Sequence, residues 1–135
     1  MAKVNIDVTL HEGESGYGAV RYRPGDILRG TVVVDPDEDV RCNHLFVMLV
    51  WHTEGRGTRY QEEAEQLDLF QGTLKVGFPR SFDFTFHLPP EPWSYAGYYI
   101  SIVWEVQVKI DVPWKRDPKH SLPFIMTPDR ETVSL

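Results

Sequence analysis

The sequence predicts an all-β protein, an immunoglobulin-like antiparallel β-sandwich of about seven or more strands. Two observations predict it. Apolar residues recur at every second position in several segments, which is the period of a strand with one buried face. Ten prolines and ten glycines separate these segments and supply turns. A chain of 135 residues is long enough to bury a core of its own as one such domain.

The longest alternating segment spans residues 100–112. Its apolar positions are Ile100, Ile102, Trp104, Val106, Val108, Ile110 and Val112. The residues between them are mostly polar, so we expect one face in the core and the other in water. Trp104 is therefore expected to pack in the core and Glu105 to face solvent. Residues 82–88 and 4–10 repeat this pattern.

Residues 27–34 and 41–53 are rich in β-branched and large apolar residues. The Asp-Pro-Asp sequence at 35–37 has turn chemistry, so we expect the two segments to pair as a hairpin. Within the second, residues 45–51 are apolar on both faces, which predicts a central strand or one covered on both sides. Trp51 alternates with these positions and is expected to pack there.

The remaining segments carry weaker patterns. Residues 67–76 are compatible with a strand that Gly72 interrupts as a bulge, and residues 122–126 with a last short strand. Residues 60–69 contain several glutamates with helical propensity but no helix-capping pattern, so we expect one helical turn there at most.

Composition restricts the class of partner and the cellular location. The 14 basic and 20 acidic residues give a net charge of −6, which argues against binding nucleic acid through its phosphates. Cys42 is the single cysteine, so no intramolecular disulfide is possible. The first residues lack the apolar block of a signal peptide, and the longest apolar run, 45–51, is too short to cross a bilayer. We expect a cytoplasmic protein without a membrane span, with one domain over residues 1–128 and a polar tail over 129–135.

No motif predicts catalysis. The five histidines lack metal-ligand spacing, no serine sits in a nucleophile elbow, and no glycine-rich phosphate loop precedes a helix. His52 and Glu54 share a strand face as the best pair of metal ligands, but a catalytic zinc takes three protein ligands and a third is not apparent. We therefore predict no catalytic residue, no metal and no cofactor. A hydrolase or metal enzyme using His52, Glu54 and His87 is the alternative.

Three loops carry residues suited to contact a partner. Residues 52–60 are interpreted as a hairpin tip rather than an anion site, residues 89–99 are stiffened by prolines, and residues 112–118 combine an aromatic ring with positive charge. Tryptophan, tyrosine and arginine dominate the energetics of protein interfaces. The candidate partner-binding residues are Arg56, Arg59, Trp93, Tyr95, Trp114, Lys115 and Arg116.

The two loop tryptophans are also suited to close the end of a sandwich. Tryptophan is highly buried on average, so packing is the favoured interpretation for Trp93. For Trp114, packing and exposure are equally supported because charges lie beside it. We expect at least one of the two rings to be partly exposed.

Several segments resemble the arrestin family. Residues 22–32, YRPGDILRGTV, resemble the Y-x-P-G-D-x-(aliphatic)-x-G segment near the start of arrestin-fold domains, and residues 45–51 resemble the aliphatic strand that follows it. Residues 86–97, FHLPPEPWSYAG, resemble that family's F-x-(aliphatic)-P…P-S-x-x-G segment, which a long strand follows. The likeness extends in order over nearly the whole chain. It implies a scaffold or adaptor without catalysis, as in arrestins, the arrestin-like retromer subunit and bacterial sporulation-control proteins.

The motif at Pro24, Gly25 and Asp26 has a structural explanation. Proline fixes φ, glycine accepts the turn conformation, and aspartate hydrogen-bonds a nearby amide. Typical arrestins join two sandwiches, whereas 135 residues hold one, so receptor, phosphate-sensing and clathrin functions do not carry over.

Besides the enzyme alternative, two non-catalytic hypotheses follow. The first is a protein-interaction domain that binds a protein partner of unknown identity through edge strands and loops, with homodimerisation through edge strands as one form. The alternative is a carbohydrate- or small-ligand-binding module in which Trp93, Tyr95 and Trp114 stack on the ligand.

Overall fold

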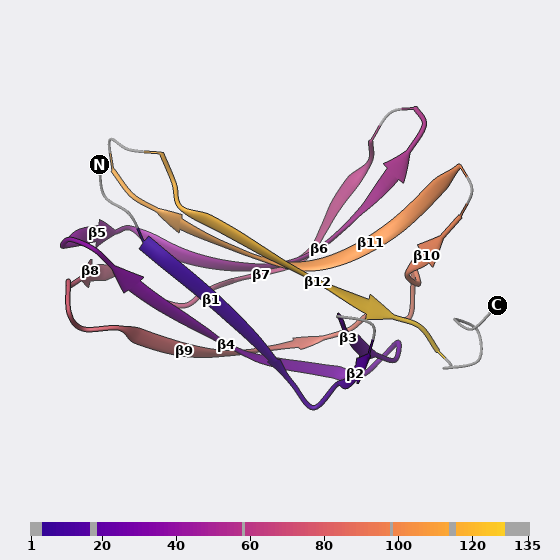
Figure 1. The fold of residues 1–135 in the computed structure, drawn as a ribbon, viewed down its shortest axis with the longest axis horizontal. Helices are drawn as coiled ribbons and strands as arrows, with labels where there is room; N and C mark the ends of the chain where they lie inside the picture. The colour runs from indigo at the N-terminus through magenta and orange to yellow at the C-terminus, as the bar shows by residue number, and fades with distance from the viewer. Residues whose placement is uncertain (1–3, 17–18, 58, 98, 114–115, 129–135) are drawn as a thin grey trace.

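The computed structural model describes residues 4–16, 19–57, 59–97, 99–113 and 116–128, and these fold into strands and loops without a helix. Two sheets face each other and enclose the core (Figure 1), and their strands pair antiparallel except for β3 and β12, which pair parallel. The predicted all-β sandwich is thereby confirmed. No helix in the described residues is long and apolar enough to cross a membrane.

The first sheet has three strands. β4 (Ile27–Pro36) lies between β1 (Val4–His11) and β9 (Arg80–His87), and both neighbours run antiparallel to it. Apolar side chains alternate with polar ones along all three, as predicted for residues 4–10 and 82–88, and the inward-facing set lies in the core.

The second sheet is larger and is built around two long strands. β6 (His44–Gly55) and β11 (Ile100–Asp111) pair antiparallel along their full length, with Trp51 opposite Trp104. The other strands of this sheet are β2 (Glu14–Gly16), β3 (Ala19–Tyr22), β7 (Gln61–Asp68), β10 (Tyr95–Ala96) and β12 (Lys119–Met126). Their order is β2-β3-β12-β11-β6-β7, and β10 pairs with β11. A separate pair, β5 (Val40–Cys42) with β8 (Gly72–Leu74), lies at one end of the sandwich.

The core contains the predicted face of β11. Trp104, Val106, Val108 and Ile110 are buried and pack against the first sheet's apolar side chains. The Trp104 indole Nε1 donates a hydrogen bond of 2.8 Å to the carbonyl oxygen of Pro92, so the ring's polar atom is satisfied inside. The prediction that Trp104 packs in the core is confirmed.

One local prediction is wrong, and one strand was not predicted. Residues 27–34 and 41–53 do not form a hairpin, because β4 and β6 belong to different sheets and the chain crosses between them through β5. Residues 60–69 contain no helical turn. They form β7, because pairing with β6 satisfies their backbone and overrides the helical propensity of glutamate.

Other segments agree more closely with their patterns. Residues 45–51 lie in the interior strand β6, and residues 122–126 lie in β12. The predicted strand over 67–76 is divided between the end of β7 and β8.

The turn before β4 has the predicted geometry. The backbone amide of Asp26 donates to the Arg23 carbonyl oxygen at 3.1 Å, and the Arg23 amide donates to the Asp26 carboxylate at 2.9 Å. Gly25 has φ of +81°, a conformation that glycine adopts without strain. This motif therefore builds the turn.

Candidate partner-binding surface

The long strands β6 and β11 of the second sheet bend away from the first sheet toward the end where β6 ends and β11 begins (Figure 1). The face turned away from the core is therefore on the inside of the bend, and we call it the concave face. A register shift between β6 and β7 at Leu49 and Val50 accompanies the bend, as expected for a β-bulge. Val50 points to the concave face, yet only 1% of it is exposed, because side chains crowd together there.

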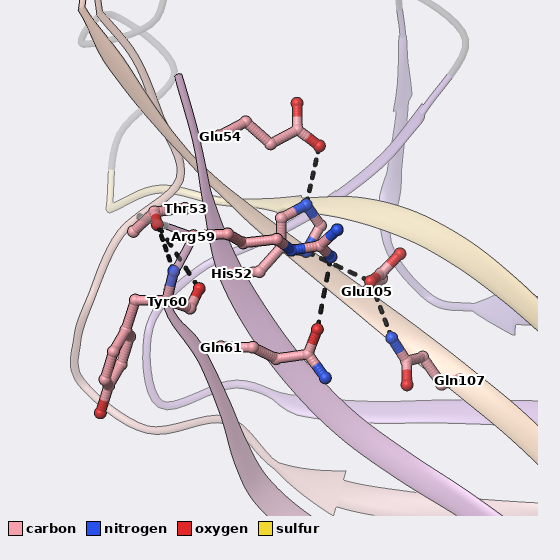
Figure 2. A network of polar contacts seen from close by, with 8 residues as sticks. All are labelled: His52, Thr53, Glu54, Arg59, Tyr60, Gln61, Glu105 and Gln107. Atoms are coloured by element: carbon pink, nitrogen blue, oxygen red, sulfur yellow. Dashed lines mark hydrogen bonds and ion pairs between the residues drawn. The ribbon is translucent and has the colours of Figure 1, made fainter. Parts of the chain in front are cut away.

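A network of polar side chains lies on the concave face (Figure 2). His52, 4% exposed, has its Nε2 atom 2.7 Å from a carboxylate oxygen of Glu54. Its Nδ1 atom lies 3.2 Å from Glu105 Oε1, an ion-pair distance without hydrogen-bond alignment. Gln107 donates a hydrogen bond of 2.8 Å to that same Glu105 oxygen. One imidazole thus lies between two carboxylates.

The expectation that Glu105 faces open solvent is wrong. Glu105 is on the predicted side of β11, but only 9% of it is exposed. Gln107, two residues along β11, and His52, a diagonal neighbour on β6, lie against it on this face, so contacts with neighbouring side chains replace contacts with water.

The alternative metal site does not assemble. Glu54 and Glu105 approach opposite nitrogens of the His52 ring, so the three groups do not converge on one point where an ion could bind. His87 lies on β9, in the other sheet. In the part of the chain that the structure describes, no three histidine, cysteine or acidic side chains are placed to hold a metal ion.

An open hollow of about 770 Å³ lies where β10 and β12 both flank β11. Trp93 and Tyr95 line it and are 49% and 59% exposed. The loop that carries them is anchored to β12, because the Ser94 amide donates to the Met126 carbonyl oxygen at 2.8 Å and the Met126 amide donates to Ser94 Oγ at 2.9 Å. The rings are therefore presented from a fixed backbone.

The exposure of Trp93 corrects the favoured interpretation that it packs at the end of the sandwich. The interior position belongs to Trp104, whose indole binds the same proline-rich loop at Pro92. The Trp93 indole instead donates to the Pro90 carbonyl oxygen at 2.8 Å, within its own loop. The expectation that at least one loop tryptophan is partly exposed is confirmed.

A second hollow, of about 310 Å³, lies at the tip of the β6–β7 hairpin. Its lining residues are Thr53, Glu54, Gly55, Arg56, Arg59 and Ile100. The tip is held to the start of β11, since the Arg56 amide donates to the Tyr99 carbonyl oxygen at 3.2 Å and the Arg56 guanidinium lies 5.8 Å from the centre of the Tyr99 ring. The predicted hairpin tip is confirmed.

Glu54 lines both hollows, so they form one continuous surface at this end of the second sheet. We call it the end surface and define it by Arg56, Arg59, Trp93, Tyr95, Tyr99 and Ile100 around Glu54. Four of the seven candidate residues meet here although they come from two separate loops. Tyr99 and Ile100, which sequence reasoning did not select, join them because β11 begins beyond the cover of the first sheet.

The third candidate loop lies elsewhere. Arg116 is exposed in the connection from β11 to β12, at the opposite end of β11 from Ile100. Trp114 and Lys115 fall outside the described residues.

Comparison with known proteins supports the fold. No protein-family profile matches the chain, and no curated protein matches it in sequence. Among solved structures, the chain is similar to the sporulation control protein Spo0M from Bacillus subtilis, with a TM-score of 0.71 and 18% identity. The match covers 92% of this chain and 49% of that one, so this chain spans about half of Spo0M. At this identity the likeness establishes an arrestin-like fold, and it confirms the predicted resemblance at that level.

Proposed function

We propose that the chain is a non-catalytic protein-interaction module, a scaffold or adaptor that binds partners through loops and edge strands in the cytoplasm. The observation that carries this proposal is the end surface, where exposed aromatic rings and two arginines from separate loops form one surface. Such residues supply most of the binding energy in protein interfaces.

The anchoring of the loops supports the same function. Hydrogen bonds to β12 hold the backbone of the loop that carries Trp93 and Tyr95. This loop therefore loses little conformational entropy when a partner binds. Arg56 and Arg59 are suited to pair with carboxylates of the partner, since a guanidinium matches a carboxylate in geometry and charge.

The test is affinity purification from the native cell with quantitative mass spectrometry. We expect a protein recovered with the wild-type chain to be depleted at least tenfold by Trp93→Ala with Tyr95→Ala, and by Arg56→Glu with Arg59→Glu. Arg41→Glu with Lys75→Glu is the matched control, because it makes the same double charge reversal on exposed residues at the β5–β8 pair, away from the end surface. The same proteins recovered with every variant would contradict the proposal.

A carbohydrate- or small-ligand-binding module is the second candidate. The hollow of about 770 Å³ beside Trp93 and Tyr95 favours it, because exposed rings stack on sugars. A glycan array separates the two functions. A glycan whose binding is lost with Trp93→Ala but kept with Arg56→Glu and Arg59→Glu would favour this candidate over the first.

A further inference from the structure

β7 is an edge strand with little cover. It ends the order of the second sheet, and seven of its eight residues are exposed, with Leu67 partly buried. β6 pairs with one side of it, and within the described residues no strand pairs with the other side. The β6–β7 hairpin also projects away from the first sheet (Figure 1). An unpaired side presents a row of backbone donors and acceptors to another strand.

The side chains of β7 are acidic on both faces. In the register with β6, Glu62 and Glu65 lie opposite core-side residues, whereas Glu63 and Asp68 lie opposite residues of the concave face. The strand contains no lysine or arginine. The side chains on either face of an added strand would therefore lie beside carboxylates of β7.

Two of these carboxylates already have partners. The Trp51 indole donates to Glu62 at 3.1 Å, and His44 lies 2.6 Å from the Asp68 carboxylate. Burial pushes the pKa of Asp68 upward, but hydrogen bonds to His44 and Gln71 outweigh it and hold the pKa below its ordinary value. Asp68 thus stays charged.

The other two carboxylates remain available. No ion pair among the described residues involves Glu63 or Glu65. Glu62, whose partner is the uncharged Trp51 indole, adds a third carboxylate without a cationic partner in that part of the chain, so these three give the exposed strand a negative charge.

This negative charge determines which kind of strand can pair with the free edge of β7. A second copy of β7 would place carboxylates opposite carboxylates, and like charges on facing strands are destabilising. Homodimerisation through this particular edge is therefore disfavoured. A segment carrying lysine or arginine at alternate positions would instead pair charge with charge on one face while its backbone completes the sheet.

We propose that β7 binds an extended, lysine- or arginine-rich segment of a partner protein as an added antiparallel strand. This inference rests on the proposed interaction function and names the edge that is used and the chemistry of the partner. The end surface, with its arginines, remains a separate contact.

The probe is an end-blocked, fluorescently labelled ten-residue peptide that alternates lysine with threonine or valine. Its Kd for the full chain is measured by fluorescence anisotropy, and the site is mapped by amide chemical shifts. We expect the shifts to concentrate on β7 and β6. A peptide with two central residues replaced by proline should bind at least tenfold more weakly, because proline cannot donate to the ladder. A glutamate-for-lysine peptide should not bind.

The protein variant is Glu63→Lys with Glu65→Lys, for which we expect at least a tenfold loss of affinity. Asp7→Lys with Asp35→Lys is the matched control, because it makes the same charge change on exposed residues of the first sheet. That control should bind within about twofold of the wild type.

Equal binding of the proline peptide, equal loss in both variants, or shifts centred away from β7 would overturn the inference. An end-surface partner still captured by the chain in that case would leave the proposed function standing, so the two failures are distinguishable.

Discussion

Replacement of Glu105 by alanine tests whether the polar network on the concave face stabilises the fold. Glu105 is nearly buried, accepts a hydrogen bond from Gln107 at 2.8 Å and lies 3.2 Å from the buried Nδ1 atom of His52. Alanine removes both contacts. The side-chain amide of Gln107 can rotate and hydrogen-bond to water instead. His52 loses the carboxylate beside its Nδ1 atom, which has no hydrogen-bond partner.

The expected cost follows from these losses. A hydrogen bond to a charged group contributes about 1.5–3 kcal/mol, and partial rehydration of Gln107 reduces this to about 1–2 kcal/mol of unfolding free energy. For a domain of this size, that loss lowers Tm by roughly 3–8 °C. Glu105→Gln keeps an acceptor oxygen and should lose less than half as much.

The measurement is urea denaturation and thermal unfolding of purified variants. Lys109→Ala is the matched control, because Lys109 lies on the same face of β11 and only a partly exposed ion pair with Asp117, at 3.6 Å, is lost; it should cost about 0–0.5 kcal/mol. A double-mutant cycle of Glu105→Ala with Gln107→Ala should give a coupling of at least about 0.5 kcal/mol. A Glu105→Ala variant as stable as Lys109→Ala would refute the reasoning.

Three further predictions concern the core. Trp104→Ala should reduce the unfolding free energy by about 3–5 kcal/mol, measured by urea denaturation, because the ring is fully buried and its indole hydrogen bond to Pro92 is lost; a cost near that of an exposed-site variant would place the ring outside the core. Burial, with nearby Glu12 and Asp26, raises the pKa of Tyr22 to about 12 from its ordinary 10. The neutral hydroxyl therefore contributes stability below about pH 10 that is lost as the pH rises toward 12, and Tyr22→Phe should flatten that part of a stability-versus-pH curve. Burial, with Asp68 and Asp111, raises the pKa of the Cys42 thiol to about 11, so Ellman's reagent at pH 8 should react slowly with the native chain and rapidly in denaturant; rapid reaction of the folded chain would contradict this burial.

The sandwich was predictable because apolar and polar residues alternate within individual strands. A strand's period depends only on its own residues, so the buried face of β11 and its Trp104 could be identified without knowing any neighbour. The pairing of strands could not be identified this way. β4 and β6 lie close in sequence with turn chemistry between them, but β4 pairs with β1 and β9, and β6 pairs with β7 and the distant β11.

The strand β7 was not predicted for a related reason. Its glutamates favour a helix in isolation, and only the hydrogen bonds from β6 hold them in a strand. The sequence also did not predict that Arg56 and Trp93 lie on one surface. The two residues are far apart in sequence, and the pairing of β6, β11 and β10 brings their loops to the same end of the sheet. The types of residue were recognisable, but their assembly depended on long-range pairing.

The part of the second sheet that extends beyond the first sheet affects which substitutions the protein can tolerate. At the tip of the β6–β7 hairpin and the start of β11, the sheet is a single layer with water on both sides, and residues such as Arg56, Tyr60 and Ile100 are exposed. A change of side-chain volume there disturbs no close-packed interior. New specificities can therefore be grafted onto this rim while the frame beneath it keeps its stability.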